Sequence, residues 1–161
     1  MRPVLVVGAT GALRPAALVL VRDGRPVAGL SRRSGPDTGI DHVAADWSDA
    51  AALEGALETA GPFSDALVYA PGAGPSVADA VRRHTDGTVV LTLTSAAAAP
   101  PPLDFDLERL RRPGFVLLQL GWASGPRWHT PAEISEGALM ALADGRSRVL
   151  GRVRPWSERP A

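Results

Sequence analysis

Residues 4–14 read Val4-Leu5-Val6-Val7-Gly8-Ala9-Thr10-Gly11-Ala12-Leu13-Arg14, and this stretch decides the fold class of the chain. Its first residues are apolar, as in a buried strand. Gly8 follows where the strand must turn sharply, and Gly11 lies where a backbone must come close to a diphosphate held by the first amides of a helix. The pattern over 12–23 suits that helix, and Gly24 ends it. The stretch therefore predicts the strand, turn and helix of a dinucleotide-binding fold.

Segments typical of strands and of helices alternate along the rest of the chain, which favours a single doubly wound α/β domain of Rossmann type. Further strands are expected at 26–30, 42–45, 65–70, 88–94, 115–120 and 148–153, and further helices at 49–59, 77–84, 105–111 and 130–144. The last helix begins at a capping box, Thr130-Pro131-Ala132-Glu133. Residues 95–102 are expected to form a loop, because their three prolines cannot continue a strand. We expect one domain over 1–154 and a tail at 155–161.

Composition excludes several classes of function. The chain has 161 residues, 45% of them hydrophobic, which is enough for one compact core. Its 17 basic and 17 acidic residues balance, and no basic face suggests nucleic acid or an anionic membrane as a partner. Without cysteine there is no thiolate nucleophile, and the three histidines lack metal-ligand spacing, so no metal is expected. No signal peptide or long apolar run is recognised, so we expect a cytoplasmic location.

Arg14 departs from the usual glycine spacing, because it stands where a third glycine normally allows close packing of helix on strand. Two interpretations stay open: an exposed helix residue, or a contact to phosphate. Coenzyme binding is altered or weakened if the side chain fills the turn.

The residues after the second expected strand indicate a preference between coenzymes. NAD-binding sites usually have an acidic residue about 20 residues after the glycines, whereas arginine suits the 2′-phosphate of NADP. Here the strand is followed by Arg32 and Arg33. We therefore expect NADP(H) rather than NAD(H), although a solvated polar turn is the alternative.

These residues together resemble the short-chain dehydrogenase/reductase superfamily, especially its atypical members with a Gly-Ala-Thr-Gly turn. The resemblance covers nearly the whole chain in element order. It implies a sheet in the order 3-2-1-4-5-6-7, with a nicotinamide coenzyme lying across the carboxyl ends of the strands. It also implies coenzyme contacts, with Asp46 near the adenine and 70–72 near the ribose. The coenzyme-binding candidates are Gly8, Thr10, Gly11, Arg14, Arg32, Arg33, Asp46, Ala70 and Gly72.

The catalytic residues of that superfamily are matched only in part. Ser95 corresponds to the family serine after the fifth strand, but the family tyrosine and the lysine one helical turn after it are missing. The only tyrosine, Tyr69, lies upstream, and the chain has no lysine. Counting forward by the family spacing reaches Glu108, with Arg112 one turn later. Glu108 is therefore a candidate acid or base, and the exposed face of a short helix is the alternative.

The loop after the sixth expected strand offers a further candidate. It contains Trp122, Arg127, Trp128 and His129, which together suit a planar, partly anionic substrate. His129 is the histidine placed for acid or base chemistry. The alternative is a packing loop in which His129 bonds to backbone just before the helix cap.

Three functions fit these observations. The first is an atypical NADP-dependent reductase of a small metabolite. The second is a non-redox enzyme of similar fold that catalyses proton transfer, cyclisation or elimination through Glu108, His129 or Asp106. The third is a non-catalytic nucleotide-binding protein or partner subunit. The expected partner is a small-molecule substrate, and family habit suggests a homodimer, although the helices after the fourth and fifth strands are short.

Overall fold

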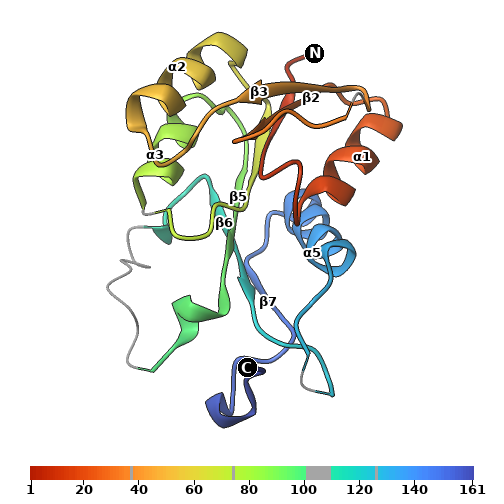
Figure 1. Ribbon diagram of the computed structural model, residues 1–161, viewed down its shortest axis with the longest axis vertical. Coiled ribbons are helices and arrows are strands. Elements are labelled where there is room, and N and C mark those ends of the chain that lie inside the picture. The colour runs from red at the N-terminus through yellow and green to blue at the C-terminus, as the bar shows by residue number, and fades with distance from the viewer. Residues whose placement is uncertain (37, 74, 101–109, 126) are drawn as a thin grey trace.

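The computed structural model describes residues 1–36, 38–73, 75–100, 110–125 and 127–161, and its centre is a seven-stranded sheet (Figure 1). The strand order is β3-β2-β1-β4-β5-β6-β7, and each neighbouring pair is parallel. The strands are β1 Val4–Val7, β2 Val27–Ser31, β3 Ile40–Ala44, β4 Asp65–Val68, β5 Val89–Leu93, β6 Phe115–Leu120 and β7 Arg148–Leu150. This order confirms the predicted doubly wound sheet.

Helices cover both faces of the sheet. They are α1 Arg14–Arg22, α2 Ala50–Ala60, α3 Pro75–Arg83 and α5 Pro131–Asp144, with short 3-10 helices η1 Ser95–Ala98 and η2 Trp156–Glu158. Figure 1 shows α2 and α3 together on one side of the sheet and α1 with α5 on the other. The two hydrophobic clusters follow this division, and β1 is buried on both faces, as a central parallel strand must be.

Helix α5 forms where the sequence predicts it, because both parts of the capping box are present. The Thr130 hydroxyl accepts from the Glu133 amide at 3.3 Å, and the Glu133 carboxylate accepts from the Thr130 amide at 2.8 Å. The helix ends at Gly145 in the left-handed conformation. Ser135 on its buried face donates to the carbonyl of Ala12 at 2.9 Å, so α5 is tied to the glycine turn.

Several predicted boundaries were wrong by a few residues. β3 begins at Ile40 rather than 42, and β4 and β7 are shorter than expected because pairing with their neighbours ends earlier. The expected loop at 95–102 begins with η1. Of the helix expected at 105–111, residues 105–109 lie outside the described residues. The expected tail contains η2, which lies with the C-terminus at the lower end of the molecule, below β7 (Figure 1).

No helix in the described part of the chain is long and apolar enough to cross a lipid bilayer. Within the same residues, no group of three or more His, Asp or Glu side chains is placed to hold a metal ion.

Candidate functional site

The glycine turn between β1 and α1 is tight. Gly8 has φ +91°, and a Cβ there would lie 2.7 Å from the carbonyl oxygen of Tyr69, so only glycine fits. The turn is closed by bonds from the Gly11 amide to the Gly8 carbonyl and from the Arg14 amide to the Gly11 carbonyl, at 3.1 and 3.0 Å. The amides of Ala12 and Leu13 donate to no carbonyl among the described residues. They are therefore available to an anion at the start of α1.

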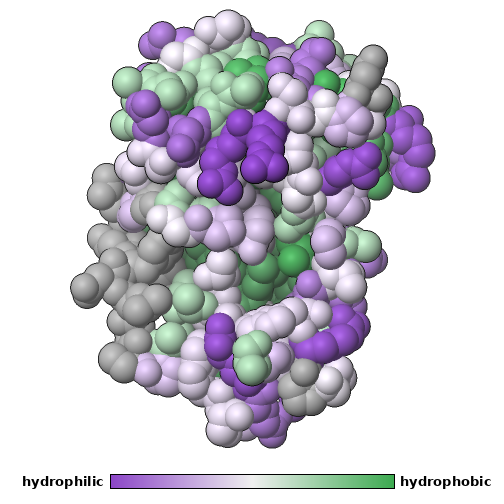
Figure 2. Space-filling view, in the orientation of Figure 1, coloured by the Kyte–Doolittle hydropathy of each residue, from purple (hydrophilic) through white to green (hydrophobic). Residues whose placement is uncertain are grey.

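A cavity of about 700 Å³ opens beside this turn, at the carboxyl ends of β1, β2 and β4. Its lining residues are Gly8, Thr10, Gly11, Ala12, Ser31, Arg32, Arg33, Trp47, Tyr69 and Pro71. The size is within the range of small-molecule and cofactor sites. In the orientation of Figure 1, hydrophilic side chains gather above and below a recessed hydrophobic strip (Figure 2).

The loop after β2 is held in place at this cavity. The Ser31 hydroxyl donates to the Arg33 carbonyl at 2.5 Å. The Arg32 guanidinium lies over the Trp47 ring, 5.8 Å from its centroid, which is a cation–π distance. Both arginines are exposed and line the large cavity, so a role in coenzyme binding and a solvated polar turn both stay open.

A second cavity of about 300 Å³ lies between the start of α1 and the loop joining β2 to β3. Arg14 and Arg33 both line it, together with Thr10. His42 lines it as well, and both of its ring nitrogens are buried with no hydrogen-bond partner among the described residues. Two cations and an unpartnered imidazole in one cavity suit an anionic group such as a phosphate.

The remaining coenzyme candidates are placed as follows. Asp46 is exposed, and its carboxylate accepts from the Ser48 hydroxyl and amide at 2.7 and 2.9 Å, bonds that hold its pKa below the usual value. Ala70 lines a small apolar cavity beside β4 and β5. Gly72 is exposed with φ +77°. Within the predicted 70–72 segment, Pro71 is a lining residue of the large cavity.

A third cavity, of about 240 Å³, lies at the carboxyl ends of β5 and β6, and we call it the substrate cavity. Its lining residues are Tyr69, Thr94, Ser95, Leu120, Gly121, Trp128, His129, Ile134 and Arg159. Tyr69 also lines the large cavity, so this residue separates the two. Burial raises the pKa of the Tyr69 phenol, because it disfavours the charged phenolate.

The structure brings Ser95 and His129 to this cavity. Ser95 is buried, and its hydroxyl accepts from Nε of Arg159 at 3.3 Å. His129 lies with Nε2 3.2 Å from the Leu150 carbonyl and Nδ1 3.6 Å from the Glu133 carboxylate. This is the packing arrangement that the sequence left open as the alternative. A catalytic role for His129 stays a prediction.

The remaining candidates from the sequence, two carboxylates and two arginines, are not among the described residues that line this cavity. Glu108 and Asp106 lie outside the described residues. Arg112 forms an ion pair with Asp79 of α3, and its guanidinium lies 4.9 Å from the Phe115 ring centroid. Arg127 makes two bonds to the Glu133 carboxylate, at 2.9 and 2.8 Å.

Tyr69 and Arg159 both line the substrate cavity, and the sequence predicted neither of them as a site residue. Tyr69 was assigned to the interior of a strand, but β4 ends at Val68 and leaves it at the sheet edge. Arg159 belongs to the expected tail, and no local pattern marks it.

No protein-family model and no curated protein matches the sequence. Solved structures do match. ChuY from Escherichia coli CFT073 has a TM-score of 0.64 at 18% identity, with 96% of this chain and 98% of that chain covered. ChuY from E. coli O157:H7, named an anaerobillin reductase, has a TM-score of 0.63 at 18% identity, with coverages of 99% and 100%. A short-chain dehydrogenase/reductase superfamily protein from Agrobacterium tumefaciens with bound NAD has a TM-score of 0.55 at 19% identity, with coverages of 75% and 49%.

These likenesses show the fold. The chain is structurally similar to the NAD(P)-binding Rossmann proteins of the short-chain dehydrogenase/reductase type, as its glycine turn and strand order predict.

Proposed function

We propose that this protein binds NADP(H) and is an atypical reductase of a small molecule. The observation that carries the proposal is the second cavity, which Arg14 and Arg33 line together with His42, whose ring nitrogens have no partner among the described residues. This cavity adjoins the glycine turn, and Thr10 and Arg33 line both cavities. A diphosphate at the turn and a 2′-phosphate at the arginines would use both sites.

The described residues fit such a coenzyme. The free amides of Ala12 and Leu13 would hold the diphosphate, since they have no carbonyl partner of their own. Arg14 and Arg33 would hold the 2′-phosphate by charge-assisted hydrogen bonds. Trp47 presents an aromatic surface in the large cavity for the adenine. When bound, the nicotinamide supplies the hydride.

The chain itself contributes position and a proton donor. The Ser95 hydroxyl lies in the substrate cavity and orients the substrate carbonyl oxygen. Tyr69 lines both the substrate cavity and the large cavity, and its phenol would be the proton donor. Tyr69 thus stands in for the tyrosine that the superfamily places on a later helix, without a lysine beside it. ChuY from E. coli O157:H7 is named a reductase, which is compatible with this role.

Calorimetric titration with NADPH and NADH tests the coenzyme preference. We expect NADPH to bind more tightly than NADH. Arg33→Ala and Arg14→Ala should each weaken NADPH at least about tenfold and leave NADH nearly unchanged, because a charge-assisted hydrogen bond contributes about 1.5–3 kcal/mol. Arg22→Ala is the matched control, since Arg22 is exposed at the far end of α1 and pairs with Asp23. Equal affinities for the two coenzymes in every variant would contradict the preference.

Activity is tested by mixing the protein with NADPH and a panel of carbonyl compounds and following the absorbance of NADPH. Tyr69→Phe should lower the rate of NADPH consumption without weakening NADPH binding. Turnover that needs no added coenzyme would favour the non-redox enzyme instead. Coenzyme binding without turnover of any compound would favour a non-catalytic protein.

A further inference from the structure

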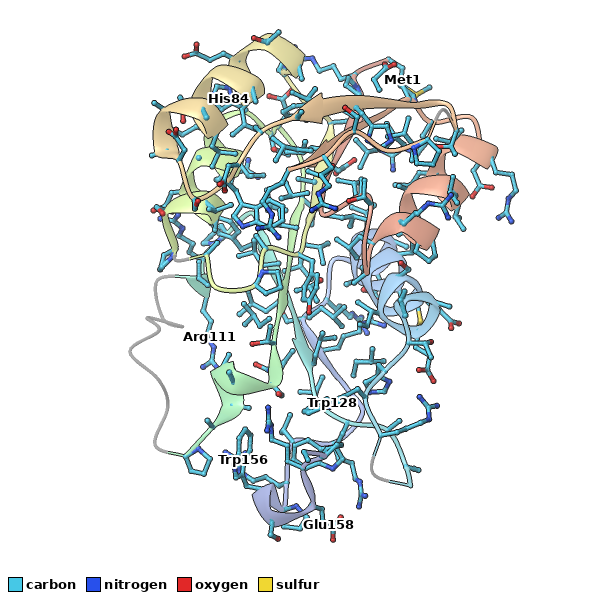
Figure 3. All side chains as sticks on the ribbon, in the orientation of Figure 1. Met1, His84, Arg111, Trp128, Trp156 and Glu158 are labelled. Carbon is cyan, nitrogen blue, oxygen red and sulfur yellow. The ribbon has the colours of Figure 1, made fainter. Side chains whose placement is uncertain are left out.

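Residues 152–161, which we call the C-terminal segment, bring Arg159 to the substrate cavity. Arg152 and Trp122 exchange two backbone hydrogen bonds of 2.9 Å, which continue the sheet edge beyond β7. The Trp156 ring then packs edge-on against the fully buried Trp122 ring, with centroids 6.0 Å apart. Figure 3 shows Trp156 at the same end of the molecule as Trp128. The segment is therefore held against the domain by specific contacts.

Further contacts fix the part of the segment nearest the cavity. Arg152 pairs with Glu158 at 3.1 Å, which closes the turn around η2. Arg154 donates to the Ala98 carbonyl of η1 at 2.9 Å, and the Trp128 indole donates to the Ala161 carbonyl at 3.3 Å. The segment is thus tied on both sides of the cavity, to η1 and to the loop before α5.

These contacts place the Arg159 guanidinium at the cavity. Its carbon lies 4.8 Å from the Trp128 ring centroid and 5.4 Å from that of Trp156, both within the range of cation–π contacts. Nε donates to the Ser95 hydroxyl. A guanidinium has five N–H donors, and the other donors of Arg159 have no hydrogen-bond partner among the described residues.

Among the described residues, no side-chain carboxylate balances the charge of Arg159 at the cavity. None of the described residues that line the cavity is an aspartate or glutamate. Arg159 also forms no ion pair with a described carboxylate, whereas Arg127 on the neighbouring loop is paired with Glu133. A planar, aromatic-flanked guanidinium with free donors is the group that binds a carboxylate by two parallel hydrogen bonds.

We propose that Arg159 binds a carboxylate of the substrate, so that the cavity accepts small carboxylic acids with a flat apolar part. The flat part lies against Trp128 and the apolar wall formed by Leu120 and Ile134. This inference rests on the proposed function, because it names the substrate class for the same cavity. Carboxylate binding itself needs no coenzyme.

Arg159 also positions Ser95 for the reaction. Because Nε donates to the Ser95 oxygen, the hydroxyl proton is left free to donate to a substrate oxygen. A cationic donor on that oxygen polarises the hydroxyl and strengthens the bond that it donates. Arg159 therefore links recognition of the carboxylate to orientation of the reacting oxygen.

Calorimetry and NMR with acid–amide pairs test the proposal: cinnamate against cinnamamide, benzoate against benzamide, and indole-3-acetate against indole-3-acetamide. Each compound is titrated into the full chain, alone and saturated with NADP⁺. We expect at least one acid to bind at least tenfold more tightly than its amide. That acid should shift the Arg159 Nε–Hε signal, which is assigned by its absence in Arg159→Gln.

The variants separate recognition from stability. Arg159→Gln should lose the preference for the acid, and Arg159→Lys should keep part of it, because lysine retains the charge without the planar pair of donors. Arg146→Gln is the matched control, since Arg146 is exposed after α5 and does not line the cavity. It should keep the preference for the acid.

The outcomes distinguish this proposal from the proposed function. If no acid of the panel binds more tightly than its amide, or if Arg159→Gln keeps the preference, the role of Arg159 is overturned even where NADPH binds normally. If an acid binds through Arg159 while NADPH does not bind, the cavity assignment stands and the coenzyme proposal fails.

Discussion

Two parts of the carboxyl edge of the sheet are built in different ways. We name them after the functions proposed for them: the nucleotide end, beside β1 and β2, and the substrate end, beside β5 and β6. The nucleotide end is formed by residues that directly follow strands: the turn from Gly8 to Gly11 after β1, and Arg32 and Arg33 after β2. At the substrate end, Ser95 and Arg159 meet although 64 positions separate them in the sequence. A site of the first kind is visible as a local motif. A site of the second kind depends on how the whole chain packs.

The largest expected effect comes from removing the ring that anchors the substrate end. Trp122 is fully buried, and Trp122→Ala should lower the free energy of unfolding by about 3–5 kcal/mol, the usual cost of such a cavity. Trp128→Ala is the control, because that side chain is 40% exposed and should cost under about 1 kcal/mol. Urea denaturation measures both. Where Trp122→Ala is folded it should retain NADPH binding, and a parallel loss at both ends would show that the two ends are coupled.

The next effect breaks the nucleotide end. Gly8→Ala puts a side chain at φ +91° with its Cβ against the Tyr69 carbonyl, which should cost about 1–3 kcal/mol of stability. NADPH binding should weaken at least about tenfold, since the turn must move. Gly55→Ala is the control, because Gly55 is exposed in α2 with open space around it and alanine there should stabilise by up to about 1 kcal/mol. Wild-type NADPH affinity in Gly8→Ala would contradict the role of the turn.

The smallest effect concerns the capping box of α5, which borders the substrate end. The Arg127 guanidinium, with the Thr130 amide, holds the pKa of Glu133 well below its usual value of 4.5. A carboxyl whose pKa is lowered on folding stabilises the protein above its unfolded pKa, and this contribution is lost as the pH falls further. The wild type should therefore lose stability below about pH 4.5 more steeply than Glu133→Gln.

Urea midpoints measured at intervals from about pH 7 to about pH 3 check this difference. The range includes the pH values, about 5 and below, at which such a carboxyl takes up its proton in the unfolded chain. Glu136→Gln is the control, because Glu136 is exposed on the same helix outside the capping box. It should follow the wild type. Identical pH profiles for the wild type and Glu133→Gln would show that the Glu133 carboxylate does not contribute to the loss of stability in acid.

Prediction from the sequence succeeded where the physical cause is local. The glycine turn and the capping box each act over a few residues, and the structure contains both, whereas the role of the arginines after β2 stays a prediction. The strand order follows from the resemblance that these motifs support. Strand ends were less accurate, because they depend on where a neighbouring strand stops pairing, as at Ile40 of β3.

The substrate end could be predicted only in part. Ser95 and His129 were found by position after strands, but the bond from His129 to the Leu150 carbonyl depends on β7 lying beside β6. Arg127 was grouped with the substrate-binding side chains. In the structure it is paired with Glu133, and its role in substrate binding stays a prediction. Arg159, not Arg127, lines the substrate cavity, because the contact between Trp122 and Trp156 holds the C-terminal segment against the domain.

The sequence by itself determined the alternation of strands and helices, the glycine turn beside the large cavity and the start of α5. Steric limits on glycine, the spacing of apolar residues and hydrogen bonds within one turn of helix are sufficient for these features. Only the tertiary structure decided that Tyr69 lies between two cavities and that Arg159 reaches Ser95. Those side chains are placed by contacts between distant parts of the chain, and such contacts exist only once the core has packed.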